Sequence, residues 1–244
     1  MKKIGIASGK GGVGKTTIAI SLALSFTSYG SGLVDADITG SNVPDVLGYS
    51  ELKVKDDRIL PAEVNGVKYV SIGQIASRDL PVMWSGKDLV AAAKQLIEKT
   101  DWGNVNYLFV DLPPGSDEIN QKLFPLLDYV VFVKIPSSLS ESKVRRMIEM
   151  ARETQTPILG LVKNFTYFEC NGEKVKVFPD DGDYGLPVLL DLPISPEVAK
   201  KKIINVDPQI FLKAMEHPVL LQKRDNPLRG LAKTLLKAMS NGNI

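Results

Sequence analysis

The sequence predicts an α/β fold in which a mostly parallel sheet of about seven or eight strands lies between helices on both faces. Short apolar runs alternate along the chain with longer segments of helical character, which is typical of such a sheet. The apolar runs occupy residues 3–7, 32–34, 69–72, 107–110, 129–133, 158–162 and 188–192. No internal repeat or low-complexity linker divides them, so we expect residues 1–244 to form a single domain.

Helices and turns are predicted between the apolar runs. Residues 89–97 and 144–151 each carry apolar side chains at helical spacing, and we expect these stripes to face the core. Residues 48–68 instead have the composition of strands and turns, with Asn65-Gly66 as a candidate two-residue hairpin turn.

The composition is that of an ordinary globular protein. With 244 residues, of which 44% are hydrophobic and 24% charged, the chain can bury one sizeable core. No apolar run reaches the roughly 20 residues that span a bilayer, and no signal-peptide pattern opens the chain, so we expect a cytoplasmic protein. The single cysteine, Cys170, cannot form an internal disulfide, in agreement with a reducing compartment.

Positive charge is concentrated towards the C-terminus. The formal net charge is +2, but residues 200–244 hold nine Lys or Arg and only three acids. Apolar residues at 228, 231, 232, 235, 236 and 239 follow helical spacing and predict an amphipathic helix. A basic helix can bind an anionic membrane or nucleic acid, but the apolar face lacks Trp and Phe. Packing on the sheet is therefore favoured over either partner.

A phosphate-binding loop is predicted at residues 8–17, between the first apolar run and a helical run at 18–26. Residues 9–16 match G-x-x-x-x-G-K-[ST], in which backbone N–H groups surround phosphate oxygens at a helix N-terminus. We expect Lys15 to reach the β- and γ-phosphates and the Thr16 hydroxyl to bind Mg²⁺. The predicted fold is therefore that of a three-layer P-loop NTPase. The expected nucleotide contacts are Gly9, Lys10, Gly11, Gly12, Val13, Gly14, Lys15, Thr16 and Thr17.

Aspartates follow two of the apolar runs, at the sheet edge where α/β proteins bind ligands. Asp35 and Asp37 follow the second run, and we expect Asp37 to orient the attacking water and to contribute to the Mg²⁺ site, with Asp35 supporting it. Asp111 follows the fourth run and has the position of a Walker B aspartate, behind the Mg²⁺.

Six motifs spread over nearly the whole chain carry a family resemblance. They are residues 9–17, 34–40, 43–48, 84–86, 110–115 and 162–170. Taken together, they resemble the motifs of the Mrp-type iron–sulfur cluster carriers, a family in the MinD/ParA group of ATPases. The resemblance implies an ATP-binding homodimer that hydrolyses ATP slowly and passes iron–sulfur clusters to apo-proteins, with these or an assembly scaffold as protein partners.

The resemblance also implies roles for individual residues. Lys10 is the early lysine that crosses the dimer interface of this group to touch the partner's nucleotide. Asn164 would recognise adenine, and Pro193, in the segment 192–196, would pack beside the base. ATP or ADP with Mg²⁺ is the implied cofactor set.

The cysteine pattern departs from the family. In the family, the cysteine of Phe-x-Cys begins a Cys-x-x-Cys motif. In this chain the same four positions read Cys170-Asn-Gly-Glu173, so the second cysteine is absent. A homodimer would then offer two thiolates, and a [4Fe–4S] cluster would need further ligands such as Glu169, Glu173, a small thiol or a partner protein. The alternative interpretation is that Cys170 is a half-buried small hydrophobe that packs without reacting.

Three functions remain compatible with these residues. The leading hypothesis is an ATPase of iron–sulfur cluster delivery, with Lys10, Lys15 and Asp37 as its catalytic residues. The alternative is a MinD/ParA-like positioning ATPase that binds membrane or DNA through the basic C-terminal region. A third is a carrier that kept the nucleotide switch and lost its cluster.

Overall fold

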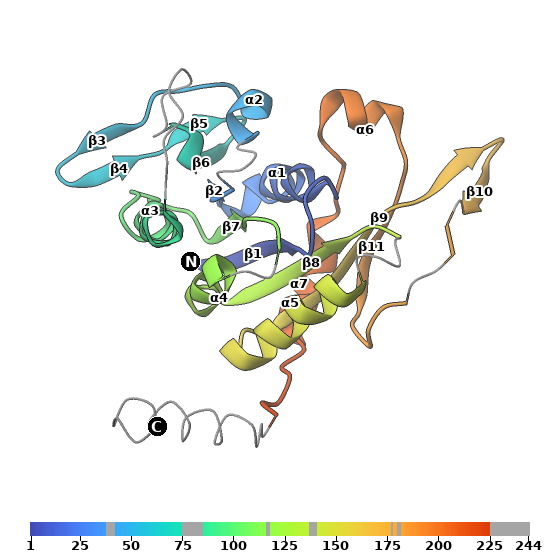
Figure 1. Cartoon of the computed structure of the whole chain (residues 1–244). Helices are drawn as coiled ribbons and strands as arrows, with labels where there is room; N and C mark the ends of the chain where they lie inside the picture. Colours follow the sequence, from blue (N-terminus) through green and yellow to red (C-terminus); the bar gives the residue numbers. More distant parts are fainter. Residues whose placement is uncertain are drawn as a thin grey trace, which may run out of the picture.

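The computed structural model describes residues 1–37, 42–74, 85–115, 118–136, 141–176, 178–179 and 182–224. Within these ranges the main sheet has nine strands in the order β10-β9-β8-β1-β7-β2-β6-β5, with β11 paired to β9 (Figure 1). A separate two-stranded sheet joins β3 to β4. The strands are β1 (Lys2–Ser8), β2 (Ser31–Asp35), β3 (Lys53–Lys55), β4 (Arg58–Leu60), β5 (Ala62–Val64), β6 (Val67–Ser71), β7 (Tyr107–Asp111), β8 (Tyr129–Lys134), β9 (Ile158–Cys170), β10 (Glu173–Lys176) and β11 (Val188–Pro193).

Helices cover both faces of this sheet, as predicted. The helices are α1 (Lys15–Ser25), α2 (Val43–Leu47), α3 (Gly86–Glu98), α4 (Glu118–Leu123), α5 (Glu141–Thr154), α6 (Pro196–Lys201) and α7 (Pro208–Glu216). Buried side chains of α3, α4 and α5 share one core with one face of the sheet. Those of α1, α2 and α7 share a second core with the opposite face. The predicted stripes of α3 and α5 are the buried faces of these helices.

All seven predicted apolar runs are strands, and six pairings join β1, β2, β6, β7, β8, β9 and β11 to one another. These pairings are all parallel. The sheet has more strands than the expected seven or eight because two short antiparallel strands extend its edges, β5 on β6 and β10 on β9. Neither has a buried apolar run, so neither produces the signal by which the other strands are predicted.

The hairpin turn at Asn65-Gly66 is confirmed. Val64 of β5 lies opposite Val67 of β6, so the turn has two residues. Both have positive φ, 51° for Asn65 and 78° for Gly66, which is the conformation that Asn-Gly sequences favour in hairpins.

Several predicted features lie outside the described residues. They are the amphipathic helix at 228–239 with the rest of residues 225–244 of the basic C-terminal segment, residues 38–40 of the motif at 34–40, and Trp84 of the motif at 84–86. None of the helices in the described ranges is long and apolar enough to cross a bilayer.

The register of three central strands positions the polar residues. Asp35 at the end of β2 lies opposite Asp111 at the end of β7, and Asp111 lies opposite Ile6, two residues before β1 ends. Because parallel strands end at the same edge, the loop after β1 and both aspartates meet there.

Candidate functional site

The loop after β1 turns sharply into α1. Gly12 and Gly14 have φ of 76° and 87°, in the left-handed region that glycine adopts without a steric cost. Gly14 is also the N-cap of α1, and its carbonyl accepts the first helical hydrogen bond, from the N–H of Ile18. A Cβ atom at Gly14 would lie 2.3 Å from the Asn164 side-chain nitrogen, so this position is closed to any other residue without rearrangement.

A compact charge cluster lies where α1 begins. The Lys15 ammonium is 2.6 Å from Asp111 Oδ1 and 3.2 Å from Asp37 Oδ2, and the Thr16 hydroxyl donates to Asp111 Oδ2 at 2.6 Å. Lys15 is 5% exposed and Asp111 fully buried. Burial alone would lower the pKa of Lys15, but the carboxylates of Asp111 and Asp37 raise it above its ordinary value of 10.5. The ammonium therefore stays charged at neutral pH.

Asp35 holds the turn that carries Asp37. Its Oδ1 accepts the backbone N–H of Asp37 at 3.1 Å, and its Oδ2 accepts the Ser71 hydroxyl at 2.8 Å. Ser71 is held in turn by Gln74, whose Oε1 accepts the Ser71 N–H at 2.7 Å. The sequence analysis named Asp35 as a support for Asp37 but missed Ser71 and Gln74, because no local pattern links them to a turn more than thirty positions earlier.

The residues at the head of α1 fit a magnesium ion. Mg²⁺ takes oxygen ligands and is usually bound by one or two protein groups together with phosphates and waters. Thr16 Oγ1 and Asp111 Oδ2 are adjacent oxygens, and Asp37 adds a carboxylate on the other side of Lys15. In the described part of the chain, no group of three or more His, Cys, Asp or Glu could hold a metal by itself.

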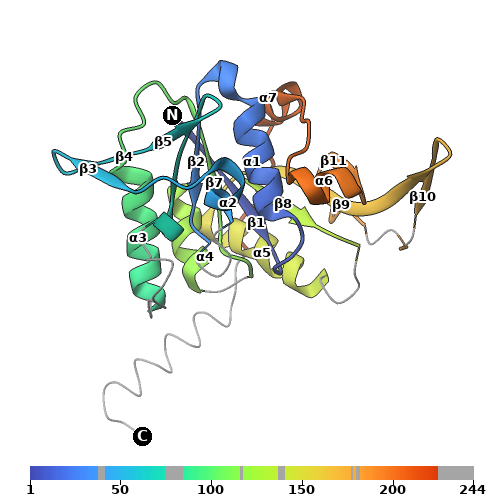
Figure 2. The same cartoon turned by 90° about the horizontal axis from the view of Figure 1, so that it is seen from above.

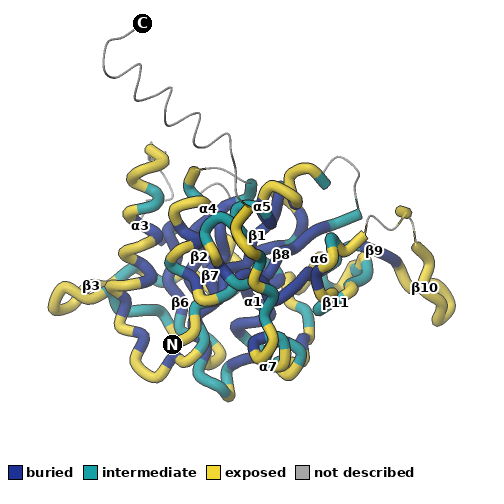
Figure 3. Tube along the Cα trace, turned by 90° about the horizontal axis from the view of Figure 1, so that it is seen from below, coloured by how far each residue is buried: buried dark blue, intermediate teal, exposed yellow. Residues whose placement is uncertain are grey.

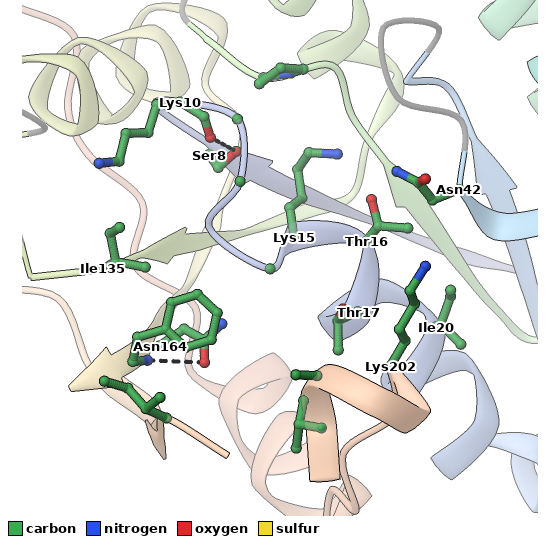
Figure 4. A pocket seen from close by; sticks show the side chains of 18 of the residues that line it. Ser8, Lys10, Lys15, Thr16, Thr17, Ile20, Asn42, Ile135, Asn164 and Lys202 are labelled. Carbon is green, nitrogen blue, oxygen red and sulfur yellow. Dashed lines mark hydrogen bonds between the residues drawn. The ribbon is translucent and has the colours of Figure 1, made fainter. Parts of the chain in front are cut away.

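A cavity of about 820 Å³ opens beside the loop. Its lining includes Lys10, Gly11, Gly12, Gly14, Lys15, Thr16, Thr17 and Asp37. It also includes residues that the sequence analysis mostly did not single out, among them Ile20, Phe165, Ile194, Ser195, Val198, Ala199 and Lys202. Ile20 follows Thr16 and Thr17 at helical spacing on α1, which is a signal that could have identified it. Figure 4 shows this arrangement.

Asn164 joins the loop to β9. Its Nδ2 donates to the carbonyl of Val13 at 2.9 Å, and its Oδ1 accepts the N–H of Phe165 at 3.1 Å. The side chain lies at the cavity wall opposite Lys15 (Figure 4). Pro193 ends β11 and does not line the cavity itself, whereas the next two residues, Ile194 and Ser195, do.

Lys10 belongs to the loop but not to the charge cluster. Its carbonyl accepts the Ser8 hydroxyl at 3.0 Å, which fixes the backbone at the start of the loop. Figure 4 shows its side chain on the opposite side of the loop from Lys15 and directed away from it. The two lysines of the motif therefore serve different sides of the loop.

Cys170 lies on a hairpin that extends beyond the rest of the sheet (Figures 1 and 2). It is the last residue of β9, it is exposed, and it lies opposite Glu173 across the two-residue turn Asn171-Gly172. The alternative interpretation of Cys170 as a half-buried residue is therefore wrong. The turn has the same Asn-Gly signature and positive φ values as Asn65-Gly66, a signal that the sequence analysis overlooked.

Comparisons with known proteins agree with this geometry. The ParA family model described as NUBPL iron-transfer P-loop NTPase matches residues 1–221. An Iron-sulfur cluster carrier protein of Aquifex aeolicus is 38% identical in an alignment of 214 residues that covers 81% of this chain and 59% of that protein. Another, from Saccharolobus solfataricus, is 34% identical in an alignment of 233 residues that covers 88% of this chain and 78% of that protein. The chain spans only 59% to 63% of the length of several such relatives.

Solved structures confirm the predicted fold class. A nucleotide-binding protein from Archaeoglobus fulgidus, in complex with ADP, superposes with a TM-score of 0.72 at 26% identity, over 91% of this chain and 94% of that one. The septum site-determining protein MinD from Pyrococcus horikoshii, complexed with Mg-ADP, shares the fold with a TM-score of 0.60 at 20% identity, over 88% and 94%. With the matched family model and these relatives, the chain belongs to the ParA family of P-loop NTPases, in its iron-transfer group.

Proposed function

We propose that this protein is a homodimeric, slowly hydrolysing ATPase that carries iron–sulfur clusters to apo-proteins in the cytoplasm, with residues 1–244 as one ATPase domain. The observation that carries the proposal is the Lys15 ammonium, held against Asp37 and Asp111 at the head of a nucleotide-sized cavity. The chain's relatives named as iron–sulfur cluster carriers support the cargo.

The charge cluster supports a division of labour in ATP hydrolysis. Lys15 is charged and adjacent to the loop, so it can exchange its contact with Asp37 for the terminal phosphates. The Asp37 carboxylate can then accept a proton of water and hold that water for attack. Thr16 and Asp111 would hold Mg²⁺, which neutralises the charge that develops on the phosphate oxygens.

The opposite end of the cavity is the proposed site of the base. Asn164 has its amide at the cavity wall, and Phe165 and Ile194 offer apolar surface for a planar ring. Pro193 would act by setting the path of Ile194 and Ser195. Adenine is the proposed base because the resemblance to the Mrp-type carriers implies it.

Lys10 is the proposed bridge to a second copy of the chain. Its direction away from Lys15 supports this role, since the side chain does not serve the phosphate site of its own loop (Figure 4). A dimer that forms only around nucleotide would let ATP change the distance between the two β9–β10 hairpins, and hence the affinity for cargo.

The cluster is the proposed cargo, and Cys170 its attachment point. Cys170 is exposed at the tip of a projecting hairpin, so two copies can offer two thiolates to one cluster. The remaining ligands would come from a small thiol, from Glu169 or Glu173, or from the recipient protein. A cluster held by two thiolates of its carrier is easily transferred, which suits a delivery function.

One anaerobic experiment tests both halves of the proposal. The full chain is incubated with ferric iron, sulfide and a small thiol, then mixed with ATP and an apo-ferredoxin, while visible absorbance and phosphate release are followed. The wild-type protein should take up a cluster and release phosphate. Cys170→Ser should lose the absorbance and keep the phosphate release, and Asp37→Ala should do the reverse.

Asp101→Asn is the matched control, because Asp101 is an exposed aspartate that does not line the cavity, and it should behave as wild type. A wild-type protein without cluster absorbance, or Cys170→Ser with all of it, would reject the cargo. Wild-type rates of phosphate release from Asp37→Ala would reject the assignment of the water-orienting carboxylate.

A further inference from the structure

Lys202 is a cation that reaches the nucleotide cavity from a helix outside the phosphate loop. It directly follows α6, and its N–H closes that helix by donating to the carbonyl of Val198 at 2.7 Å. Its φ is 55° and its ψ 26°, a left-handed conformation that glycine or asparagine usually adopts at a helix end. The backbone therefore places this side chain at the cavity wall, at a steric cost that glycine would avoid.

The Lys202 side chain runs along α1. It lines the cavity together with Thr17 and Ile20, the residues of α1 that follow the phosphate loop. Figure 4 shows it extending beside Thr17 and Ile20, towards the end of α1 that carries Thr16 and on the other side of the cavity from Asn164. The ammonium is therefore near the phosphate half of the cavity.

The surroundings of Lys202, as far as the structure describes them, offer its ammonium group no anion. No carboxylate in the described ranges forms an ion pair with it, and Asp37, the only acid among the described residues that line the cavity, is paired with Lys15. The nearest parts of the wall, Val198 and Ala199 of α6 and Ile20 of α1, are apolar. A cation in such a wall is suited to an anionic ligand.

We propose that Lys202 binds the α-phosphate of the nucleotide. This inference rests on the proposed nucleotide binding and adds a contact that the phosphate loop does not supply. The terminal phosphates belong to Lys15 and Thr16, and the base lies towards Asn164 and Ile194. Lys202 lines the cavity with Val198 and Ala199 of α6 and extends beside Thr17, where the first phosphate after the ribose would sit (Figure 4).

The test exploits the unusual backbone at this position. Lys202→Gly removes the ammonium and installs the residue that suits φ of 55°, so the midpoint of thermal unfolding should be unchanged or higher. Calorimetric titration should show ADP and AMP each binding about three- to tenfold more weakly than to wild type, as for a partly screened charge contact. Adenosine should bind both proteins equally, and the difference for ADP should shrink at high salt.

Lys201→Ala is the matched control, since Lys201 precedes Lys202 in the same lysine run but does not line the cavity, and it should bind ADP as wild type does. Lys202→Arg should retain most of the affinity. Equal ADP affinity of Lys202→Gly and wild type would overturn the contact, and an equal loss for adenosine would overturn its assignment to the α-phosphate. A wild-type protein that binds no ADP would instead overturn the proposed function. Lys202→Asn, which also suits this backbone, replaces the glycine variant if the latter does not fold.

Discussion

The nucleotide cavity and the β9–β10 hairpin are built on opposite principles. At the cavity, charged groups are buried and hold one another, as Lys15 holds Asp37 and Asp111. At the hairpin, every residue of β10 is exposed, and so is Cys170 at the end of β9 (Figure 3). The difference suits the roles proposed for the two regions, because a reaction site has to be organised before its ligand arrives, whereas a site that gives its cargo away has to remain accessible.

The two regions also differ in how many of the groups that each needs are supplied by one chain. The groups that the phosphate site needs converge within one chain, from the edge where β1, β2 and β7 end. The hairpin offers one thiol per chain, and iron–sulfur clusters are ordinarily held by four. The hairpin therefore depends on other molecules for most of the ligands of a cluster, whereas Lys15, Thr16, Asp37 and Asp111 all come from one chain, and matched substitutions in the two regions should separate the two proposed functions.

The largest contrast is expected between two lysines. Lys15→Ala leaves Asp111 buried without its counter-charge, which should cost about 3–5 kcal/mol of unfolding free energy, and it should abolish ATP binding. Lys174→Ala removes an exposed ammonium 4.5 Å from the Tyr167 ring centroid on the hairpin, which should cost less than about 1 kcal/mol. Urea unfolding and calorimetric titration with ATP measure both quantities.

The pH dependence of the same variants gives a second measurement. Asp111 and Asp37 raise the pKa of Lys15 in the folded protein, so the resulting stability is fully present below the unfolded value of 10.5. It is lost as the pH rises through the higher folded pKa. The difference in unfolding free energy between wild type and Lys15→Ala should therefore shrink above pH 10.5.

A Lys174→Ala variant that lost ATP binding would contradict the separation of the two regions.

The second contrast uses two glycines with similar backbones. Gly14 and Gly172 have φ of 87° and 80°, so an alanine at either position carries about 1–2 kcal/mol of backbone strain. At Gly172 nothing lies within 4 Å of the added Cβ, while at Gly14 it meets the Asn164 amide at 2.3 Å. We expect Gly172→Ala to bind ADP normally and Gly14→Ala to lose at least about tenfold in affinity through overpacking.

Both variants are measured by urea unfolding and by ADP titration. If Gly14→Ala bound ADP as tightly as Gly172→Ala does, the close contact between the loop and Asn164 would have no part in shaping the nucleotide site. The unfolding data supply the control, since the two variants share the backbone strain and differ only in the added contact.

The fold was predictable where burial imposes a pattern. The strands of the parallel core are apolar runs such as 107–110 and 129–133, and their alternation with helices is enough to predict the layers. β10 could not be predicted in this way, because its side chains are exposed and impose no periodicity. Its turn, Asn171-Gly172, does carry a local signal, which reflects a positive φ rather than burial.

The site was predictable where chemistry requires a fixed spacing. The phosphate loop and the two strand-end aspartates follow from backbone geometry that acts over a few residues, and the sequence analysis named all of them. Ser71 supports Asp35 through parallel pairing of β2 with β6, and Lys202 reaches Thr17 because α6 packs near α1. Neither contact has a counterpart in local sequence, since both arise from packing between distant segments.

The smallest contrast concerns two asparagines whose substitution by alanine should lower the free energy of unfolding by similar amounts. Asn164→Ala removes the amide that donates to the Val13 carbonyl, which should cost about 1–3 kcal/mol. Asn171→Ala places a Cβ-bearing residue less suited than asparagine at φ of 52° in the hairpin turn, with a cost of about 1 kcal/mol. Only Asn164→Ala should also reduce the preference for ATP over GTP, because only Asn164 has its amide at the cavity wall. Competition binding of the two nucleotides measures this preference, and unchanged selectivity in Asn164→Ala would leave Asn164 as a residue that only braces the loop.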